Sequence, residues 1–119
     1  MRSIVTGIAL AAALAVPIAA AAECQKDRAG QVICGAGPCA RDTQGQVFCA
    51  PARFGSVVRT TRGETVCARG QCVITLDGDV VCSAVDGGGA VEQSDGSVRC
   101  EGRCERATTG MCERNPAGR

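Results

Sequence analysis

Histidine, tryptophan and tyrosine are missing from this chain of 119 residues, and only two phenylalanines, Phe48 and Phe54, are present. Because the chain has no histidine, a serine or cysteine nucleophile would lack the base that activates it in most hydrolytic triads. Catalysis by a pair of carboxylates is not excluded, because Glu64, Asp79 and Glu92 can approach one another in a fold. Their spacing in the sequence, however, gives no indication that they form such a pair. Two phenylalanines also cannot fill a conventional aromatic core, so another source of stability is required.

An excess of charge of either sign is missing as well. The chain has 13 basic and 12 acidic residues, for a formal net charge of +1. A balance of this kind gives no overall field that would attract nucleic acid or an anionic membrane. We therefore expect no nucleic-acid partner. We also expect no cofactor, because no motif in the sequence indicates a ligand, whereas a protein partner is possible.

A long apolar run is found only at the start, within residues 1–22. Met1 and Arg2 precede the run, and Ala20–Ala22 supplies the small side chains that a signal peptidase requires. The run is marginal in length for a membrane span, and Pro17 interrupts it. We predict a signal peptide cleaved before Glu23, export to the periplasm or the medium, and no stable membrane insertion. Lipidation of Cys24 is disfavoured because the charged Glu23 precedes it.

Cysteine is abundant, and all ten copies follow the predicted cleavage site. An even number in a short exported chain is typical of a disulfide framework. The disulfide cysteines we predict are Cys24, Cys34, Cys39, Cys49, Cys67, Cys72, Cys82, Cys100, Cys104 and Cys112.

One sequence motif, Gly-x-[Val/Thr]-x-Cys, occurs five times. Its cysteines are Cys34, Cys49, Cys67, Cys82 and Cys100. Their sequence numbers advance in alternating steps of 15 and 18, so two copies of the motif form one repeat with a period of 33. Internal repetition indicates supersecondary units whose neighbours complete each other's buried surface. The recurrent glycines and the β-branched residues before each cysteine favour strands over helices.

Each copy fits a β-hairpin with a three-residue loop. In the segment 39–49, the loop Thr43-Gln44-Gly45 places glycine where a left-handed backbone is needed. Gly30 and Gly78 occupy the same place in their segments. We predict an all-β, disulfide-rich stack of about five hairpins over residues 23–112, followed by a disordered tail over 113–119.

The hairpin register also predicts the pairing of the cysteines. Cysteines opposite each other in one hairpin lie within disulfide range. The expected bonds are Cys24–Cys34, Cys39–Cys49, Cys72–Cys82, a shortened terminal hairpin Cys104–Cys112, and Cys67–Cys100 between units. A competing scheme joins near neighbours as Cys34–Cys39, Cys67–Cys72 and Cys100–Cys104, and pairs the remaining four cysteines at long range.

Several motifs have a chemical and a structural interpretation. The near-neighbour cysteines permit a thiolate metal site, but thiols oxidise outside the cytoplasm. The sequence contains no Cys-x-x-Cys pair, which is the motif that would indicate a thioredoxin-like enzyme. Asp77-Gly78-Asp79 is too short an acidic run for calcium and suits a turn. The three glycines at 87–89 predict a flexible connector.

Arg59 and Arg62 lie on one predicted hairpin and could be presented to a partner, as in a protease inhibitor. Disulfide scaffolds suit such a role because they hold a loop rigid and lower its entropic cost of binding. Solvated strand and turn positions also explain both residues.

The stretch Cys34-Gly-Ala-Gly-Pro-Cys39-Ala-Arg-Asp, followed by Gly-x-Val-x-Cys49, resembles short cysteine-rich exported proteins of bacteria. The resemblance covers residues 34–49, about one hairpin, and implies export to the bacterial envelope without implying an activity. Our expectation is a non-enzymatic exported structural or protein-interaction module. A thiolate metal-binding protein is the first alternative, and a protease inhibitor or other secreted effector is the second.

Overall fold

The computed structural model describes residues 23–117, so the predicted signal peptide at 1–22 lies outside the described residues. The described part contains twelve strands and one turn of 3-10 helix. The first ten strands are β1 (Glu23–Lys26), β2 (Val32–Gly35), β3 (Cys39–Arg41), β4 (Val47–Cys49), β5 (Ser56–Arg59), β6 (Thr65–Ala68), β7 (Cys72–Ile74), β8 (Val80–Ser83), β9 (Ala90–Glu92) and β10 (Val98–Cys100). The chain ends with β11 (Cys104–Arg106), the 3-10 turn η1 (Thr109–Met111) and β12 (Asn115–Pro116).

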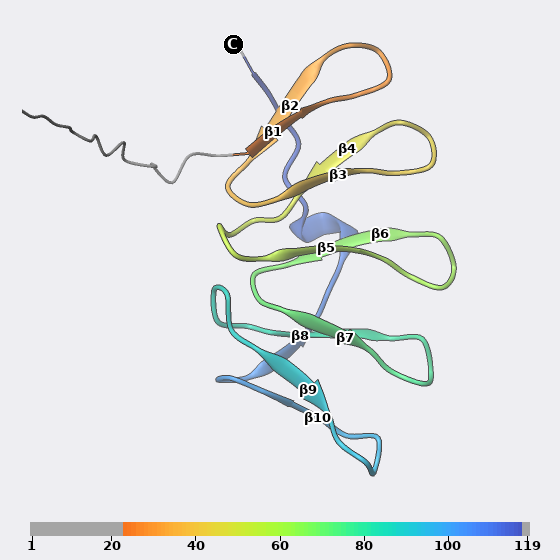
Figure 1. The fold of residues 1–119 in the computed structure, drawn as a ribbon, viewed down its shortest axis with the longest axis vertical. Helices are drawn as coiled ribbons and strands as arrows, with labels where there is room; N and C mark the ends of the chain where they lie inside the picture. The colour runs from red at the N-terminus through yellow and green to blue at the C-terminus, as the bar shows by residue number, and fades with distance from the viewer. Residues whose placement is uncertain (1–22, 118–119) are drawn as a thin grey trace, which may run out of the picture.

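The first ten strands form five successive antiparallel hairpins, here called the first to the fifth hairpin in chain order. Figure 1 shows them stacked like rungs, with the hairpin turns along one edge and the connectors along the other. The all-β hairpin stack predicted from the repeat is therefore confirmed. No helix within residues 23–117 is long and apolar enough to cross a membrane.

The hairpin turns have the predicted conformation. In the second hairpin the Asp42 amide donates to the Gln46 carbonyl over 2.8 Å, and the Gly45 amide donates to the Asp42 carbonyl over 3.1 Å. Gly45 has a φ of 85°, in the left-handed region. The turn glycines of all five hairpins share this conformation: Gly30, Gly45, Gly63, Gly78 and Gly96.

A side-chain cap completes each of the first four turns. In the second hairpin, the Asp42 carboxylate accepts hydrogen bonds from the Gln44 and Gln46 amides. Its counterparts at the same offset before the turn glycine accept from the backbone in the same way: Asp27, Thr60 and Thr75. Short acceptor side chains that bond to their own turn are typical of such positions.

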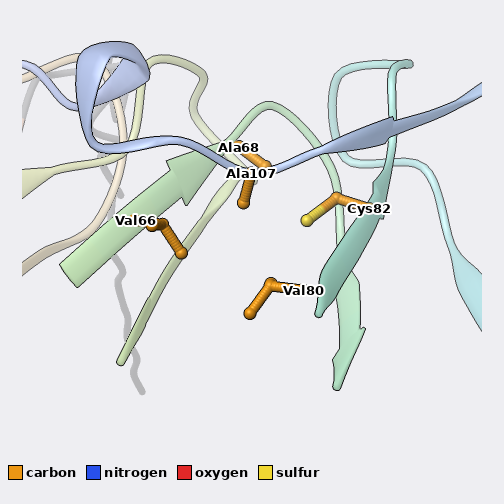
Figure 2. Close-up of a cluster of buried hydrophobic side chains, with 5 residues drawn as sticks. All are labelled: Val66, Ala68, Val80, Cys82 and Ala107. Carbon is orange, nitrogen blue, oxygen red and sulfur yellow. The ribbon is translucent and has the colours of Figure 1, made fainter. Parts of the chain in front are cut away.

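Two small cores lie one repeat apart. The first packs Ile33 of the first hairpin against Val47 and Cys49 of the second. The second core, drawn in Figure 2, holds the counterparts of these residues in the next repeat: Val66, Val80 and Cys82. The structural unit is therefore a pair of hairpins, with its apolar residues enclosed between the two rungs.

The last segment, residues 104–117, runs back along the stack, and we call it the C-terminal strap (Figure 1). Strand β11 pairs with β8, and β12 pairs with β2 as the third strand of their sheet. Between these strands, the Cys67 amide donates to the Thr108 carbonyl, and Cys49 and Glu113 exchange two backbone hydrogen bonds. The strap thus bonds to the second strand of each of the first four hairpins.

The predicted disordered tail is wrong for residues 113–117, because they belong to the strap. The Arg114 guanidinium lies 4.9 Å from the Phe48 ring centroid and donates to the Val47 carbonyl. The Ala117 amide donates to the Val32 carbonyl. The second strands offer backbone groups that would otherwise lack a partner, and the strap satisfies them.

All ten cysteines form disulfides, and three of the five predicted bonds are confirmed: Cys24–Cys34, Cys39–Cys49 and Cys72–Cys82. Their Cα atoms are 3.9 to 4.0 Å apart, as expected for opposed strand positions. The predictions Cys104–Cys112 and Cys67–Cys100 are wrong. The bonds formed are Cys67–Cys112 and Cys100–Cys104, the latter shared with the competing scheme.

The strap explains both errors. Cys104 begins β11 beside Ser83, so the chain leaves the fifth hairpin there without forming a terminal hairpin. Cys112 is thereby carried along the stack to the third hairpin, whose first strand has Val57 opposite Cys67. A second-strand cysteine without a partner in its own hairpin is thus bonded to the strap.

The segment 87–89 is confirmed as a connector, but its backbone is more constrained than a flexible linker. The Gly87 amide donates to the Arg69 carbonyl over 2.8 Å, and the Gly88 amide donates to the Val85 carbonyl over 2.8 Å. The Gly89 amide donates to the Glu101 carboxylate over 2.7 Å.

Candidate interaction groove

A groove of about 300 Å³ lies between the second and third hairpins. Its wall and floor residues come from β3, β5 and β6: Ala40, Arg41, Val57, Val58, Arg59 and Thr65. The floor is aliphatic, and the two arginines are exposed at its rim. We call this hollow the interaction groove.

A small residue leaves room for the groove. Ala40 lies opposite Phe48 in the second hairpin, whereas its counterpart one repeat later is Val73, opposite Val81. Neither of the two cores spans the junction between the second and third hairpins. The apolar surface of Val57 is therefore only partly covered there, whereas Val58 packs against the second core.

The two rim arginines have no ionic partner within residues 23–117, where the ion pairs are Arg69–Glu105 and Arg106–Asp79. Arg41 Nη2 donates to the Lys26 carbonyl over 2.6 Å, so its guanidinium is held against the first hairpin. Arg59 makes no hydrogen bond from its side chain to the described residues. Arg59 is therefore the cation that can meet a ligand in the groove, and a cation beside an aliphatic floor suits a ligand that is both anionic and apolar.

The equivalent junction, between the fourth and fifth hairpins, lacks these cations. The counterparts of Arg41 and Arg59 are Ile74 and Glu92. The repeat therefore places hairpins at both junctions, while the side chains at these two positions change from basic to neutral or acidic. The basic rim is a property of this one junction and is not a requirement of the fold.

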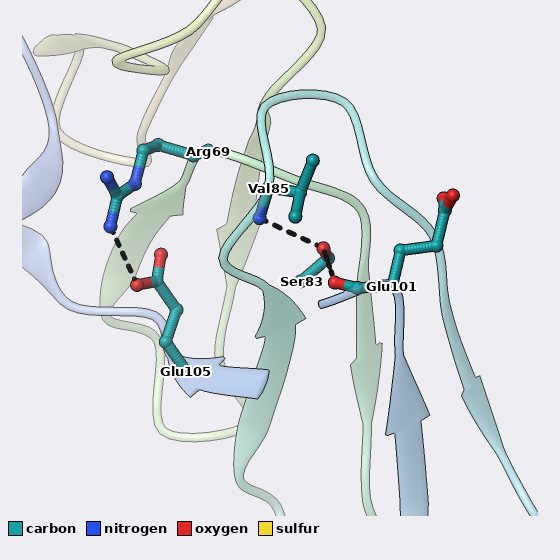
Figure 3. Close-up of polar contacts among 5 residues, drawn as sticks. All are labelled: Arg69, Ser83, Val85, Glu101 and Glu105. Atoms are coloured by element: carbon teal, nitrogen blue, oxygen red, sulfur yellow. Dashed lines mark hydrogen bonds and ion pairs between the residues drawn. The ribbon is translucent and has the colours of Figure 1, made fainter. Parts of the chain in front are cut away.

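Another arginine, Arg69, illustrates a structural role. Its guanidinium donates to the Glu105 carboxylate over 3.0 Å and joins a connector to the strap, as Figure 3 shows. The hydrogen bond and charge of Glu105 raise the pKa of Arg69 above its ordinary value. Ser83, fully buried nearby, donates to the Glu101 carbonyl and accepts from the Val85 amide. These contacts hold the connectors in place.

The three carboxylates considered from the sequence do not form one site. Glu64 and Asp79 line a cleft of about 230 Å³ between the third and fourth hairpins, and Glu92 lies elsewhere. Two arginines line the same cleft, and Arg106 donates to Asp79 over 3.4 Å. The Asp77-Gly78-Asp79 motif forms a hairpin turn, and residues 23–117 contain no cluster of three potential metal ligands.

Arg59 and Arg62, considered together from the sequence, have different surroundings. Arg59 lies at the groove rim, whereas Arg62 lies in the turn of the third hairpin beside the carboxylate cleft. The sequence-based prediction selected Arg59 but missed Arg41. Comparing equivalent positions of the two repeats, where Arg41 corresponds to Ile74, would have found it.

Comparison with known proteins gives no relative: no family model, no curated protein and no solved structure matches the chain. The proposed function therefore rests on the interaction groove and the Arg59 side chain at its rim.

Proposed function

We propose that this protein is an exported, non-enzymatic module that binds a protein partner through the interaction groove. The observation that carries the proposal is the rim arginine Arg59, without an ionic partner among residues 23–117, beside the aliphatic floor. Such a surface suits a segment that combines acidic and apolar side chains, because each part of the segment finds its complement.

The cross-links support a binding role because they hold the groove in shape. Cys39–Cys49 closes the hairpin above the groove, and Cys67–Cys112 ties the hairpin below it to the strap. Binding to a preorganised surface costs less entropy than binding to a mobile one. Five disulfides indicate an environment outside the reducing cytoplasm. The apolar N-terminal run and the resemblance to exported bacterial proteins support the periplasm or the medium.

Two other functional classes, hydrolytic enzymes and thiolate metal-binding proteins, are less well supported. A catalytic triad usually needs a histidine base, and the chain contains no histidine. Thiolate metal binding requires free thiols, and all ten cysteines are oxidised in the structure. Both observations favour recognition over catalysis or metal storage.

The proposal is tested by photo-crosslinking in cells that export the protein. A benzophenone amino acid in place of Thr65, on the groove wall, is expected to give a covalent adduct with a protein. The matched control carries the same group in place of Val98, the counterpart of Thr65 at the other junction. Absence of an adduct at position 65, or an equal yield at both positions, would contradict the proposal.

A further inference from the structure

The turn of the fourth hairpin presents a large apolar side chain to solvent. Leu76 is 94% exposed, and Ile74 on the same hairpin is 45% exposed. Asp77 follows Leu76 in the turn. A leucine at this exposure gains no burial energy within its own chain, and it would gain that energy if a second surface covered it.

This turn has the chemistry that the groove lacks. It pairs aliphatic side chains with an acidic group, whereas the groove pairs an aliphatic floor with Arg59. From these observations we propose that the groove receives the turn of the fourth hairpin, residues 75–78, from a second copy of this chain. Leu76 contacts the floor at Ala40 and Val57, and Asp77 pairs with Arg59.

The wider charge distribution agrees with this arrangement. In residues 23–68 basic side chains exceed acidic ones: Lys26, Arg28, Arg41, Arg53, Arg59 and Arg62 against Glu23, Asp27, Asp42 and Glu64. In residues 72–100 the excess is acidic: Asp77, Asp79, Asp86, Glu92 and Asp95 against Arg99. Two copies in opposite orientation therefore bring unlike charges together, which favours and orients association.

The groove and the turn are placed so that both contacts can form at once. All five hairpin turns lie along one edge of the stack (Figure 1). The turn of the fourth hairpin adjoins that of the third, since a Cβ on Gly78 would lie 3.1 Å from Thr61 Oγ1. Groove and turn are thus one hairpin apart on one chain. Two copies related by a two-fold axis can each insert a turn into the other's groove, as an isologous dimer requires.

The inference rests on the proposed binding function and is tested by sedimentation of the purified, oxidised protein up to about 1 mM. We expect a reversible dimer. Arg59→Glu, Asp77→Arg and Leu76→Ser each alter an exposed side chain, so the fold should be retained, and each should raise the dimer Kd by at least about tenfold. Arg53→Glu, with the same charge change in the connector between β4 and β5, should leave Kd unchanged.

A charge exchange makes the test specific. The double variant Arg59→Glu with Asp77→Arg restores an unlike pair across the contact, and it should dimerise more tightly than either single variant. A protein that stays monomeric over the whole range, or a double variant weaker than both single variants, would overturn the inference. A monomer that still gives a position-65 adduct with another protein would overturn only this inference, whereas a monomer without an adduct would overturn the binding function as well.

Discussion

The first and second repeat units bury the same three positions but are cross-linked differently. In the first unit each hairpin has its own disulfide, Cys24–Cys34 and Cys39–Cys49. In the second unit only the fourth hairpin has one, and the third is bonded through Cys67 to the strap. The cores nevertheless correspond, with Ile33 replaced by Val66. The hairpin pair is therefore set by the repeated turns and apolar residues, whereas the cross-links can be exchanged.

The strap makes this exchange possible. Its backbone pairs with the second strand of both hairpins in each unit, at Cys34, Cys49, Cys67 and Cys82. A hairpin without its own disulfide can thus be anchored through the strap. Stability is then shared between short local loops and one long loop that closes the stack.

The largest difference between the units should come from removing their cross-links. In the chain-entropy view a disulfide stabilises according to the length of the loop that it closes. Replacing both Cys67 and Cys112 with alanine opens a loop with a sequence separation of 45 and should cost about 4 kcal/mol. Replacing both Cys39 and Cys49, in the first unit, opens one with a separation of 10 and should cost about 2.8 kcal/mol.

Urea unfolding of these two variants and of a third sharpens this ranking. Removing the Cys100–Cys104 bond, with a separation of 4, should cost about 2 kcal/mol. The expected losses in unfolding free energy follow loop length. Equal losses, or a larger loss for Cys100–Cys104 than for Cys67–Cys112, would contradict the role given to the strap.

The second comparison concerns the two cores. Ile33→Ala should destabilise the protein by about 2 to 5 kcal/mol, because it leaves a cavity between the first two hairpins. Val66→Ala, at the matching position, removes about one methylene less and should cost about 1 kcal/mol less. Thermal or urea unfolding measures both. A negligible loss for either variant would mean that its core does not hold the unit together.

The smallest expected difference concerns two turns with the same backbone. Gly45 and Gly63 have φ of 85° and 89°, so alanine strains either one by about 1 to 2 kcal/mol. A Cβ on Gly45 would also lie 2.5 Å from Arg28 Cβ, whereas one on Gly63 would have no atom within 4 Å. Gly45→Ala should therefore cost about 1 kcal/mol more than Gly63→Ala. Equal unfolding free energies would show that the first two turns do not pack as described.

The hairpins were predictable because each is specified locally. The offset of Gly45 from Cys39 and Cys49 gives loop length, register and facing cysteines within one short segment. The capping acceptors, such as Asp42, are equally visible as Asp or Thr at a fixed offset before the turn glycine, but the prediction of the turns uses only the glycine and cysteine positions.

The strap was not predictable by the same reasoning, because it pairs residues far apart in the chain. Residues 104–117 lack the repeated motif and have few β-branched residues, so the sequence predicts a shortened terminal hairpin over 104–112 and a tail from residue 113. These residues are positioned by hydrogen bonds to the backbone of the second strands, which has free donors and acceptors along that edge. The groove escaped prediction for a related reason, since it depends on Ala40 and Arg41 lying beside the next hairpin along the chain.

The central claim is that disulfides and the strap, and not a large apolar core, hold this fold together. It is tested most directly by amide dispersion in a two-dimensional NMR spectrum of the mature chain before and after full reduction. The account predicts dispersed amides in the oxidised protein, and collapse to the narrow range of an unfolded chain once all ten thiols are free. Dispersion retained in the fully reduced protein would mean that the apolar contacts of the two cores suffice, and would contradict the account.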